Sequence, residues 1–510
     1  MNTVGVRRRW LFGDQLGPAF LDSPDQPALI IEAHSVLRRR AFHRQKAHLI
    51  LSAMRHRALE LGERVRYLKV DTYREALAQV DDPLSVVQPT SWAALHLVDR
   101  LAAERDIERL PARGYATSRA DFDRWADGRG GKRLLMEDFY RDARLRLDVL
   151  IEDASPGVRG GRPPRSAQAG KPTAGRWNFD ADNREPPTRA DTLGLPEPWW
   201  PVEDEIDAEV RDDLDRLERE GVRFVGEDGP RTFAATRAEA TAALDDFVEH
   251  RLPTFGKYED AVLTEDRWMA HSMLSAPLNL GLLDPLEEVE AAVEAYRVGD
   301  APIASVEGFV RQVIGWRDYI WHLYWYLGED YRHGNELQAE VDLPQWFVEL
   351  DPGGTDAACL RWALTSVREV GWAHHIPRLM VLGNYALQRG WDPQQLTDWF
   401  HRSFVDGYDW VMVPNVVGMS QHADGGILAT KPYAGGGNYI NKMTDHCGGC
   451  VFDPKVRVGE RACPFTVGYW MFIHRHRERF AKNFRMAQMV RGLDRLSDLE
   501  QLVADNPDLA

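Results

Sequence analysis

The chain has 510 residues, of which 44% are hydrophobic, so it can bury more than one core. Its net charge of −16 argues against a protein that coats nucleic acid indiscriminately, because such binding needs many Lys and Arg contacts to phosphates. No apolar run approaches the roughly 20 residues of a membrane-spanning helix, and no secretion signal is recognisable. We therefore expect a cytoplasmic protein without membrane association.

Residues 1–150 are predicted to form a Rossmann-like α/β domain. Short apolar runs that read as strands alternate with helical patterns, such as the stretch from Arg38 to Leu61. The strand candidates are Arg9–Phe12, Ala28–Glu32, Val65–Val70 and the segment around Leu95–Leu97. Strand, helix, strand at this spacing implies a parallel sheet with crossover helices.

Residues 151–202 read as an interdomain linker, because Gly, Pro, Arg and Ser replace the periodic pattern. A plain tether is the simplest interpretation of residues 154–172. Trp177 and Phe179 are expected to dock the rest of the linker on a domain surface, since a disordered tether rarely keeps large aromatic side chains.

Residues 203–510 are predicted to form a mainly α-helical domain, because apolar residues recur at three- and four-residue spacing. Near its end, His474–Arg477 with Arg479, Lys482 and Arg485 forms a basic cluster within an acidic chain. This cluster is either a local nucleic-acid contact or a solvated helix face.

The four cysteines indicate a metal centre. Cys447 and Cys450 are separated by two glycines, Cys463-Pro464 follows after twelve residues, and Cys359 lies far upstream in a helical stretch. This uneven spacing is unlike a disulfide framework. A CxxC followed by Cys-Pro suits an iron–sulfur cluster, and four cysteines also suit a tetrahedral zinc ion.

Residues 371–443 carry the most specific motifs in the chain. These are Ala373-His374-His375-Ile376-Pro377-Arg378, Gly383-Asn384-Tyr385, the run Asp406-Gly407-Tyr408-Asp409-Trp410 through Asn415 to Gln421, and Thr430-Lys431-Pro432-Tyr433. Together with Phe309–Tyr319 and the cysteine spacing, they resemble the photolyase/cryptochrome superfamily. Within it they resemble the bacterial iron–sulfur branch, whose studied members repair (6-4) photoproducts in DNA.

The resemblance implies an N-terminal α/β antenna domain, a long linker and a helical domain that holds FAD. It also implies that Cys359, Cys447, Cys450 and Cys463 hold a [4Fe–4S] cluster, and that a ribityllumazine antenna is gripped partly by an acid such as Glu32. UV-damaged DNA is the implied partner, and a monomer is expected because DNA must reach the helical domain.

The resemblance also implies the residues that bind FAD. The segment from His271 to Ser275 would meet the pyrophosphate, Asn415 would face flavin N5, and Asp406 and Asp409 would contact the ring edge or the ribose. The full predicted set is His271, Ser272, Leu274, Ser275, Gln312, Trp316, Arg317, Arg378, Asp406, Asp409 and Asn415.

His375 is the predicted catalytic acid, with His374 beside it and Tyr433 as a further candidate in the lesion pocket. One electron on a (6-4) lesion leaves an anion, and returning the hydroxyl between the bases needs a positioned acid. Gln312 stands where photolyases acting on cyclobutane dimers carry glutamate, which favours (6-4) chemistry. Trp316 offers a flat face to a flipped nucleotide.

Trp399 fits the family's electron chain to the flavin. Phe400 follows it where relatives have tyrosine, and Asp351 stands near a position at which relatives have tryptophan, with Trp346 the nearest candidate. The altered path keeps open the main alternative, a cryptochrome-type photoreceptor. Iron–sulfur DNA glycosylases place their four cysteines in one tight run, unlike this chain, and a zinc-bound structural protein would leave the flavin motifs unexplained.

Overall fold

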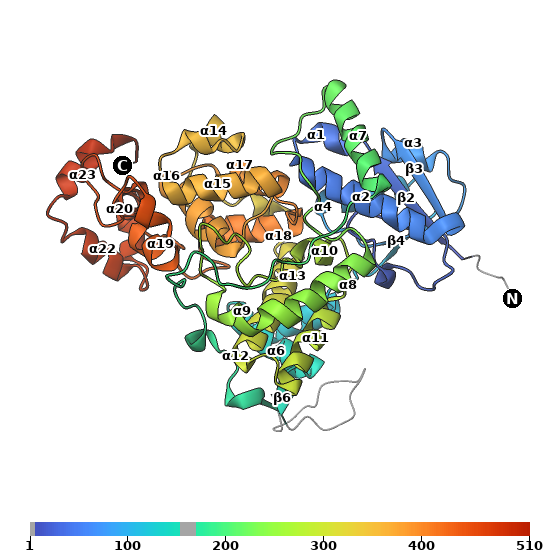
Figure 1. Cartoon of the computed structure of the whole chain (residues 1–510), viewed down its shortest axis with the longest axis horizontal. Coiled ribbons are helices and arrows are strands. Elements are labelled where there is room, and N and C mark those ends of the chain that lie inside the picture. The colour runs from blue at the N-terminus through green and yellow to red at the C-terminus, as the bar shows by residue number, and fades with distance from the viewer. Residues whose placement is uncertain (1–5, 153–169, 510) are drawn as a thin grey trace.

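The computed structural model describes residues 6–152 and 170–509. Figure 1 shows the parallel sheet at one side of the molecule, the C-terminal helices at the opposite side, and a third group of helices below and between them. No helix among the described residues combines the length and the apolar character needed to cross a membrane.

Five parallel strands form the N-terminal sheet, in the spatial order β3-β2-β1-β4-β5. They are β1 (Arg8–Leu11), β2 (Ala28–Ala33), β3 (Val65–Val70), β4 (Leu84–Val87) and β5 (Ile107–Leu110). All residues of β2 and β4 are buried, as expected for parallel strands that helices cover on both faces. The predicted Rossmann-like α/β domain is therefore confirmed.

One predicted strand was wrong. Leu95–Leu97 lies in helix α4, Trp92–Ala102, and the fourth strand is Leu84–Val87. The Ser91 hydroxyl accepts a hydrogen bond from the Ala94 amide at 3.2 Å and caps this helix. A short apolar run does not by itself distinguish a strand from a helix. In this segment the Ser91 cap favours the helix.

Helices make up most of the remaining described chain, as predicted. Their bounds are α1 Ser35–Arg39, α2 Arg44–Leu61, α3 Tyr73–Leu77, α5 Arg119–Gly128, α6 Met136–Leu147, α7 Glu205–Arg219, α8 Arg237–Asp246, α9 Leu252–Tyr258, α10 Ser275–Asn279, α11 Pro285–Val298, α12 Ile303–Val310, α13 Asp318–Tyr326, α14 Gln345–Val348, α15 Ala358–Val370, α16 Asn384–Arg389, α17 Pro393–Ser403, α18 Asp409–Val413, α19 Gly437–Met443, α20 Pro464–Arg475, α21 Arg477–Ala481, α22 Ala487–Leu493 and α23 Leu499–Asp505. A two-stranded antiparallel ribbon, β6 Ile151–Glu152 and β7 Lys171–Pro172, brackets the undescribed segment.

Four segments of the helical part are π-helices: η5 (Phe247–Arg251), η6 (Arg311–Arg317), η9 (Pro377–Gly383) and η10 (Pro414–Ser420). Three of them, η6, η9 and η10, contain predicted flavin-binding residues. Single π-helical turns inside longer helices occur often at functional sites.

The predicted tether, residues 154–172, falls mostly outside the described residues, because the structure does not describe residues 153–169. The two aromatic residues do dock. Phe179 is buried, its amide donates to a Glu307 carboxylate oxygen at 3.0 Å, and the Trp177 carbonyl accepts from Arg144 at 3.0 Å.

The predicted domain boundaries at residues 150 and 202 stay a prediction. Helix α6 packs against η6 and α13, and Phe122 of α5 stacks on His322 of α13 with ring centroids 4.8 Å apart. The chain before residue 150 therefore shares a hydrophobic core with the helical part.

Candidate active site and metal centre

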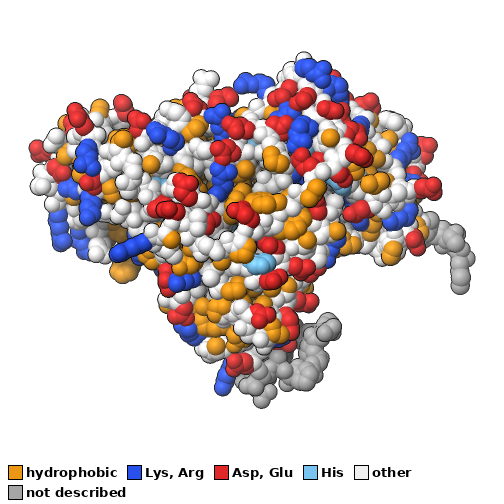
Figure 2. Space-filling view, in the orientation of Figure 1, with side chains coloured by type: hydrophobic (Ala, Val, Ile, Leu, Met, Phe, Trp, Pro, Cys, Tyr) orange, Lys and Arg blue, Asp and Glu red, His pale blue; other side chains and the backbone are white. Residues whose placement is uncertain are grey.

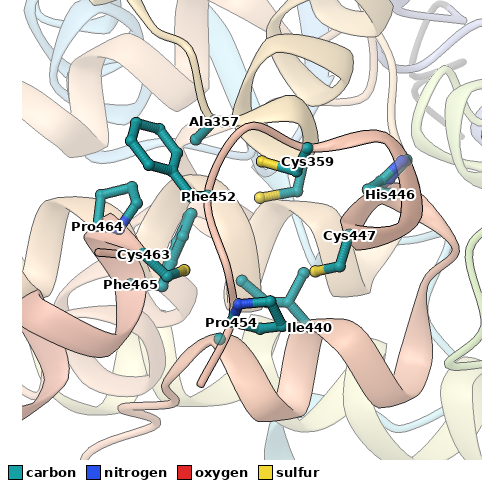
Figure 3. A pocket seen from close by; sticks show the side chains of 12 residues that line it. Ala357, Cys359, Ile440, His446, Cys447, Phe452, Pro454, Cys463, Pro464 and Phe465 are labelled. Atoms are coloured by element: carbon teal, nitrogen blue, oxygen red, sulfur yellow. The ribbon is translucent and has the colours of Figure 1, made fainter. Parts of the chain in front are cut away.

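The four cysteines lie around one pocket, although Cys359 is far from the others in sequence. Cys359 is the second residue of α15, Cys447 lies in the short helix η11 (His446–Gly449), Cys450 follows that helix, and Cys463 caps α20. No disulfide bond joins any of the four. In Figure 3 the sulfur atoms of Cys359, Cys447 and Cys463 point toward a shared space.

The wall of this pocket is largely apolar, so the thiols are its principal donors. Ile440, Phe452 and Phe465 line this pocket together with the cysteines. Gly437 passes so close to the centre that a Cβ atom there would lie 2.9 Å from the Cys463 sulfur. Only glycine allows this approach.

The sulfur atoms are spread too widely for a single small ion. Among the described residues, no three cysteine sulfurs lie within 4.8 Å of one another. A tetrahedral zinc ion with Zn–S bonds of about 2.3 Å would hold its four sulfurs about 3.8 Å apart. The spread thus suits a group with several metal atoms.

Three predicted flavin-binding residues form one hydrogen-bonded unit. Arg378 of η9 binds Asp406 through two parallel hydrogen bonds of 2.8 and 3.0 Å, and the Ser275 hydroxyl donates to the same carboxylate at 2.7 Å. The Arg378 guanidinium also lies over the Phe404 ring at 4.2 Å. Two-pronged Arg–carboxylate pairs fix both side chains in orientation.

His271 and His374 stack on each other, with ring centroids 4.0 Å apart. The Nε2 atom of each is buried without a hydrogen-bond partner among the described residues. Burial lowers the pKa of His271 to about 3 and the pKa of His374 well below its ordinary value. Two neutral imidazoles therefore present unpaired nitrogen atoms at this position.

His375 stands differently from its neighbour. Its side chain is exposed, whereas His374 is buried, although many protein atoms lie around the His375 ring. These surroundings, with the positive charge of Arg378, lower its pKa to about 4. The ring is therefore neutral near pH 7 in the free protein.

Trp316 lies close to the segment that carries His375, and the loop that carries Tyr433 is fixed to α16. Trp316 packs against a cluster that contains Ile376, the residue after His375. Gln312, one turn before Trp316, donates to the Gly308 carbonyl at 3.3 Å. Tyr433 is 37% exposed, and the Gly435 carbonyl that follows accepts from Asn384 at 2.7 Å, which fixes this loop to α16.

Asn415 lies on η10 with its side-chain oxygen free of donors among the described residues. Its amide nitrogen donates to the Val411 carbonyl at 2.8 Å, which turns the oxygen away from the helix. An amide held in this way can accept a hydrogen bond from an N–H group.

Other predicted flavin-binding residues form contacts with neighbouring protein groups. Asp409 accepts from the Tyr324 hydroxyl at 2.7 Å and from Arg332 at 3.3 Å, so it is not joined to the Asp406 unit. Arg317 lies over the Tyr115 ring at 4.6 Å and donates to the Gly114 carbonyl at 2.9 Å. Leu274 is buried, and its amide donates to the Ser272 hydroxyl at 3.4 Å.

Trp399 is buried in an aromatic cluster. Its indole nitrogen donates to the Phe347 carbonyl at 2.9 Å, and its ring centroid is 4.3 Å from that of Phe347. Phe347 in turn lies 4.8 Å from Trp391, which lies 6.3 Å from Trp346. Asp351 instead caps a short turn by accepting from the Gly353 amide at 2.9 Å.

The comparison with known sequences decides the family. The chain is 39% identical to a protein named (6-4) photolyase from Agrobacterium fabrum, over 96% of this chain and 95% of the relative. Residues 9–162 and 166–227 match the family model described as deoxyribodipyrimidine photo-lyase-related protein. The chain belongs to the photolyase/cryptochrome family.

Solved structures of this family share the fold. A bacterial class III photolyase from Agrobacterium tumefaciens superposes with a TM-score of 0.53 at 13% identity, covering 85% of this chain and 83% of that one. A cryptochrome from Synechocystis sp. PCC6803 gives 0.54 at 13% identity, covering 82% and 83%. The α/β sheet followed by a helical region is thus the photolyase/cryptochrome arrangement.

Two residues next to the Arg378–Asp406–Ser275 unit carried no sequence signal. The buried Lys46 of α2 donates to the His401 carbonyl at 2.6 Å and to the Gly407 carbonyl, next to Asp406. Burial lowers its pKa to about 7. The Asn279 amide donates to the Asp406 carbonyl at 3.2 Å. Both act across long sequence separations that only an alignment or a structure shows.

The acid expected to grip an antenna is also occupied. Glu32 accepts two hydrogen bonds from Arg55, at 2.9 and 3.1 Å, and one from Tyr67. Asp14, after β1, accepts instead from Thr90, which follows β4. Asp14 and Thr90 lie past the carboxyl ends of the neighbouring strands β1 and β4, where ligands bind in open α/β sheets.

Proposed function

We propose that this protein repairs (6-4) photoproducts in UV-damaged DNA under light, using reduced FAD. The observation that carries the proposal is the exposed His375 beside the unpaired nitrogens of His271 and His374 and the Arg378–Asp406–Ser275 unit. The named (6-4) photolyase that aligns over nearly the whole chain supports it.

The residues present fit FAD. The orphaned Nε2 atoms of His271 and His374 and the free oxygen of Asn415 are polar atoms that a bound group would satisfy. Arg378, Asp406, Ser275 and Asn415 would hold it, with Trp316 and Gln312 at the lesion side. When bound and reduced, FAD supplies one electron to the lesion under light and receives it back after repair.

His375 then donates a proton to the lesion and accepts a proton back after repair. The bond between the two pyrimidines breaks, and the hydroxyl returns to the base from which it came, so atoms balance with no added reagent. The pKa of about 4 belongs to the free protein. Negative charge on the DNA and the lesion raises it toward neutrality, because an opposite charge favours the imidazolium.

We further propose that the four cysteines hold a [4Fe–4S] cluster. The spread of their sulfur atoms, wider than a zinc tetrahedron allows, supports this choice over zinc. For the ribityllumazine antenna, Asp14 and Thr90 at the sheet edge are better candidates than Glu32, whose oxygens Arg55 and Tyr67 occupy.

Electron supply to the site is proposed to run through Trp399. Phe347 joins Trp399 to Trp391 with centroid separations of 4.3 and 4.8 Å. Trp391 could therefore serve as the second tryptophan of the chain, in place of the one that relatives have near Asp351.

We propose that the protein acts as a monomer.

The test is blue-light illumination of two duplexes, one with a single (6-4) lesion and one with a single cyclobutane dimer, followed by chromatography of the nucleosides. Restored pyrimidines from the (6-4) duplex alone are expected. Repair of the cyclobutane dimer alone would contradict the lesion assignment. A flavin-loaded protein that repairs neither would favour the cryptochrome-type photoreceptor.

A further inference from the structure

Phe484 is the most exposed large hydrophobic side chain among the described residues, at 96%. It lies in the connection between α21 and α22. Holding a whole aromatic ring in water forfeits the roughly 1.5–3 kcal/mol that burying such a side chain contributes. A partner that covers the ring would recover this free energy.

The residues around Phe484 are firmly placed. The Asn483 side chain accepts from the Arg485 amide at 2.9 Å and donates to the Thr430 carbonyl at 3.4 Å. Arg485 donates to the Thr430 hydroxyl at 2.6 Å, and Met486 is buried. The ring therefore projects from an anchored tip rather than from a loose loop.

This anchoring places the Phe484 tip beside the loop that carries Tyr433. Thr430, which the tip binds through Asn483 and Arg485, is three residues before Tyr433. Ala434 packs against the hydrophobic cluster that contains Phe480 and Met486. Two exposed aromatic rings, Phe484 and Tyr433, thus stand on adjoining segments next to the proposed lesion site.

Positive charge surrounds these rings. Among the described residues, Lys431, Lys482 and Arg485 have no carboxylate within 4.0 Å, whereas Arg477 and Arg479 pair with Asp494 at 2.8 Å and Glu336 at 2.6 Å. Figure 2 shows several Lys and Arg side chains along the edge formed by the C-terminal region. Unpaired cations around an exposed ring are unusual in a chain of net charge −16.

We propose that Phe484 packs against DNA bases beside the lesion, while Lys431, Lys482 and Arg485 contact the flanking phosphates. This proposal rests on the proposed function and deepens it, because a lesion leaves the duplex only if its neighbours are unstacked. Apolar side chains wedge into base steps in many DNA-bending proteins, and base–aromatic stacking contributes about 1–3 kcal/mol per base. Lys and Arg contacts to phosphates supply affinity without sequence preference.

The experiment compares Phe484→Ala, Phe484→Trp and the control Val202→Ala, which truncates another exposed apolar residue, at 85% exposure, outside this surface. Anisotropy in the dark measures binding to a duplex with one (6-4) lesion, and 2-aminopurine opposite the lesion reports unstacking. Phe484→Ala should weaken binding about 5- to 150-fold and lower the 2-aminopurine signal. Phe484→Trp and Val202→Ala should bind like wild type, with unchanged flavin content.

A second arm tests the cations. Lys431→Ala and Lys482→Ala should each reduce the slope of log affinity against log salt by about 1. Unchanged slopes, or wild-type binding by Phe484→Ala, would overturn the proposal. So would sedimentation showing that wild type self-associates and Phe484→Ala does not, because the ring would then contact a second copy.

Failure of the proposed repair function can be distinguished from failure of the proposed Phe484 contact, because the binding assays need neither light nor turnover. If wild type repairs nothing but Phe484→Ala still loses binding to DNA, the contact stands and the repair assignment fails. If wild type repairs and Phe484→Ala binds normally, only the contact is refuted.

Discussion

At the scale of single residues, Arg378 has the most demanding geometry in the proposed flavin site. Its guanidinium satisfies both Asp406 oxygens, donates from Nε to the Ala373 carbonyl at 2.5 Å and lies over Phe404. A lysine offers one charged nitrogen and no planar face, so it cannot replace these contacts together.

Arg378→Lys should therefore loosen flavin. Hydrogen bonds to charged groups contribute about 1.5–3 kcal/mol each, so losing one predicts roughly 10- to 150-fold weaker flavin retention. Flavin released on dilution, followed by fluorescence, measures the effect. Arg361→Lys, on the exposed face of α15, is the matched control, and equal retention by both variants would refute the role of Arg378.

The histidines of the site give the protein a defined pH dependence. The pKa values of His271 and His375 are lowered to about 3 and 4, and that of His374 is lowered well below its ordinary value, whereas the unfolded chain takes up these protons near pH 6.5. Their contribution to stability is therefore complete above about pH 6.5 and is lost as the pH falls toward 4.

The midpoint of thermal unfolding should thus fall steeply between pH 6.5 and pH 4. Replacing His271 and His374 together by Asn should flatten this slope, while His333→Asn, at an exposed position, should leave it unchanged. Scanning fluorimetry across this range measures both. A double variant as acid-sensitive as wild type would contradict the assignment of the slope to these residues.

At the scale of elements, the π-helices hold the site together. Gly383, the last residue of η9, approaches η10 so closely that a Cβ atom would lie 2.2 Å from the Ser420 hydroxyl oxygen. η9 carries Arg378 and η10 carries Asn415, so this contact fixes the separation of two proposed flavin ligands.

Gly383→Ala should separate these segments, at a cost of about 1–3 kcal/mol from overpacking. Expected results are a lower unfolding midpoint and reduced flavin content, with partial recovery in Gly383→Ala/Ser420→Gly. Gly128→Ala is the control, because a Cβ atom there meets nothing within 4 Å. Normal flavin content in Gly383→Ala would show that the approach is not needed.

Some secondary-structure elements could be predicted from the sequence, and others could not. Val65–Val70 was predicted with its observed bounds because Val65, Tyr67 and Val70 favour strands. Leu95–Leu97 was misread because the start of its helix depends on the Ser91 cap. The π-helical turns could not be predicted, since they share the apolar period of ordinary helices. The stack of His271 on His374 joins residues about a hundred positions apart, which no local pattern reports.

At the scale of the whole molecule, the cysteine centre joins distant segments. Cys359 is the second residue of α15, whereas Cys463 immediately precedes α20, and Figure 1 shows these helices in neighbouring groups. A shared metal group would fasten the C-terminal helices to the rest of the helical part. The four cysteines were predicted as one set from spacing, but the width of their arrangement needed the structure.

Cys359→Ser should remove iron, because a hydroxyl is a poor ligand for it, and should expose the C-terminal helices to limited proteolysis. Ser366→Ala in the same helix is the control. Iron by mass spectrometry and the visible absorption shoulder measure the loss. Full iron content in Cys359→Ser, or zinc in the wild-type protein, would contradict the cluster.

Restoration of one defined lesion under blue light tests whether His375 acts in the repair of (6-4) lesions. Wild type and His375→Asn are compared at equal flavin content and saturating DNA. We expect restored pyrimidines with wild type, and none with His375→Asn although its flavin is still reduced by light. Equal restoration by both proteins, or none by wild type despite normal flavin reduction, would contradict it.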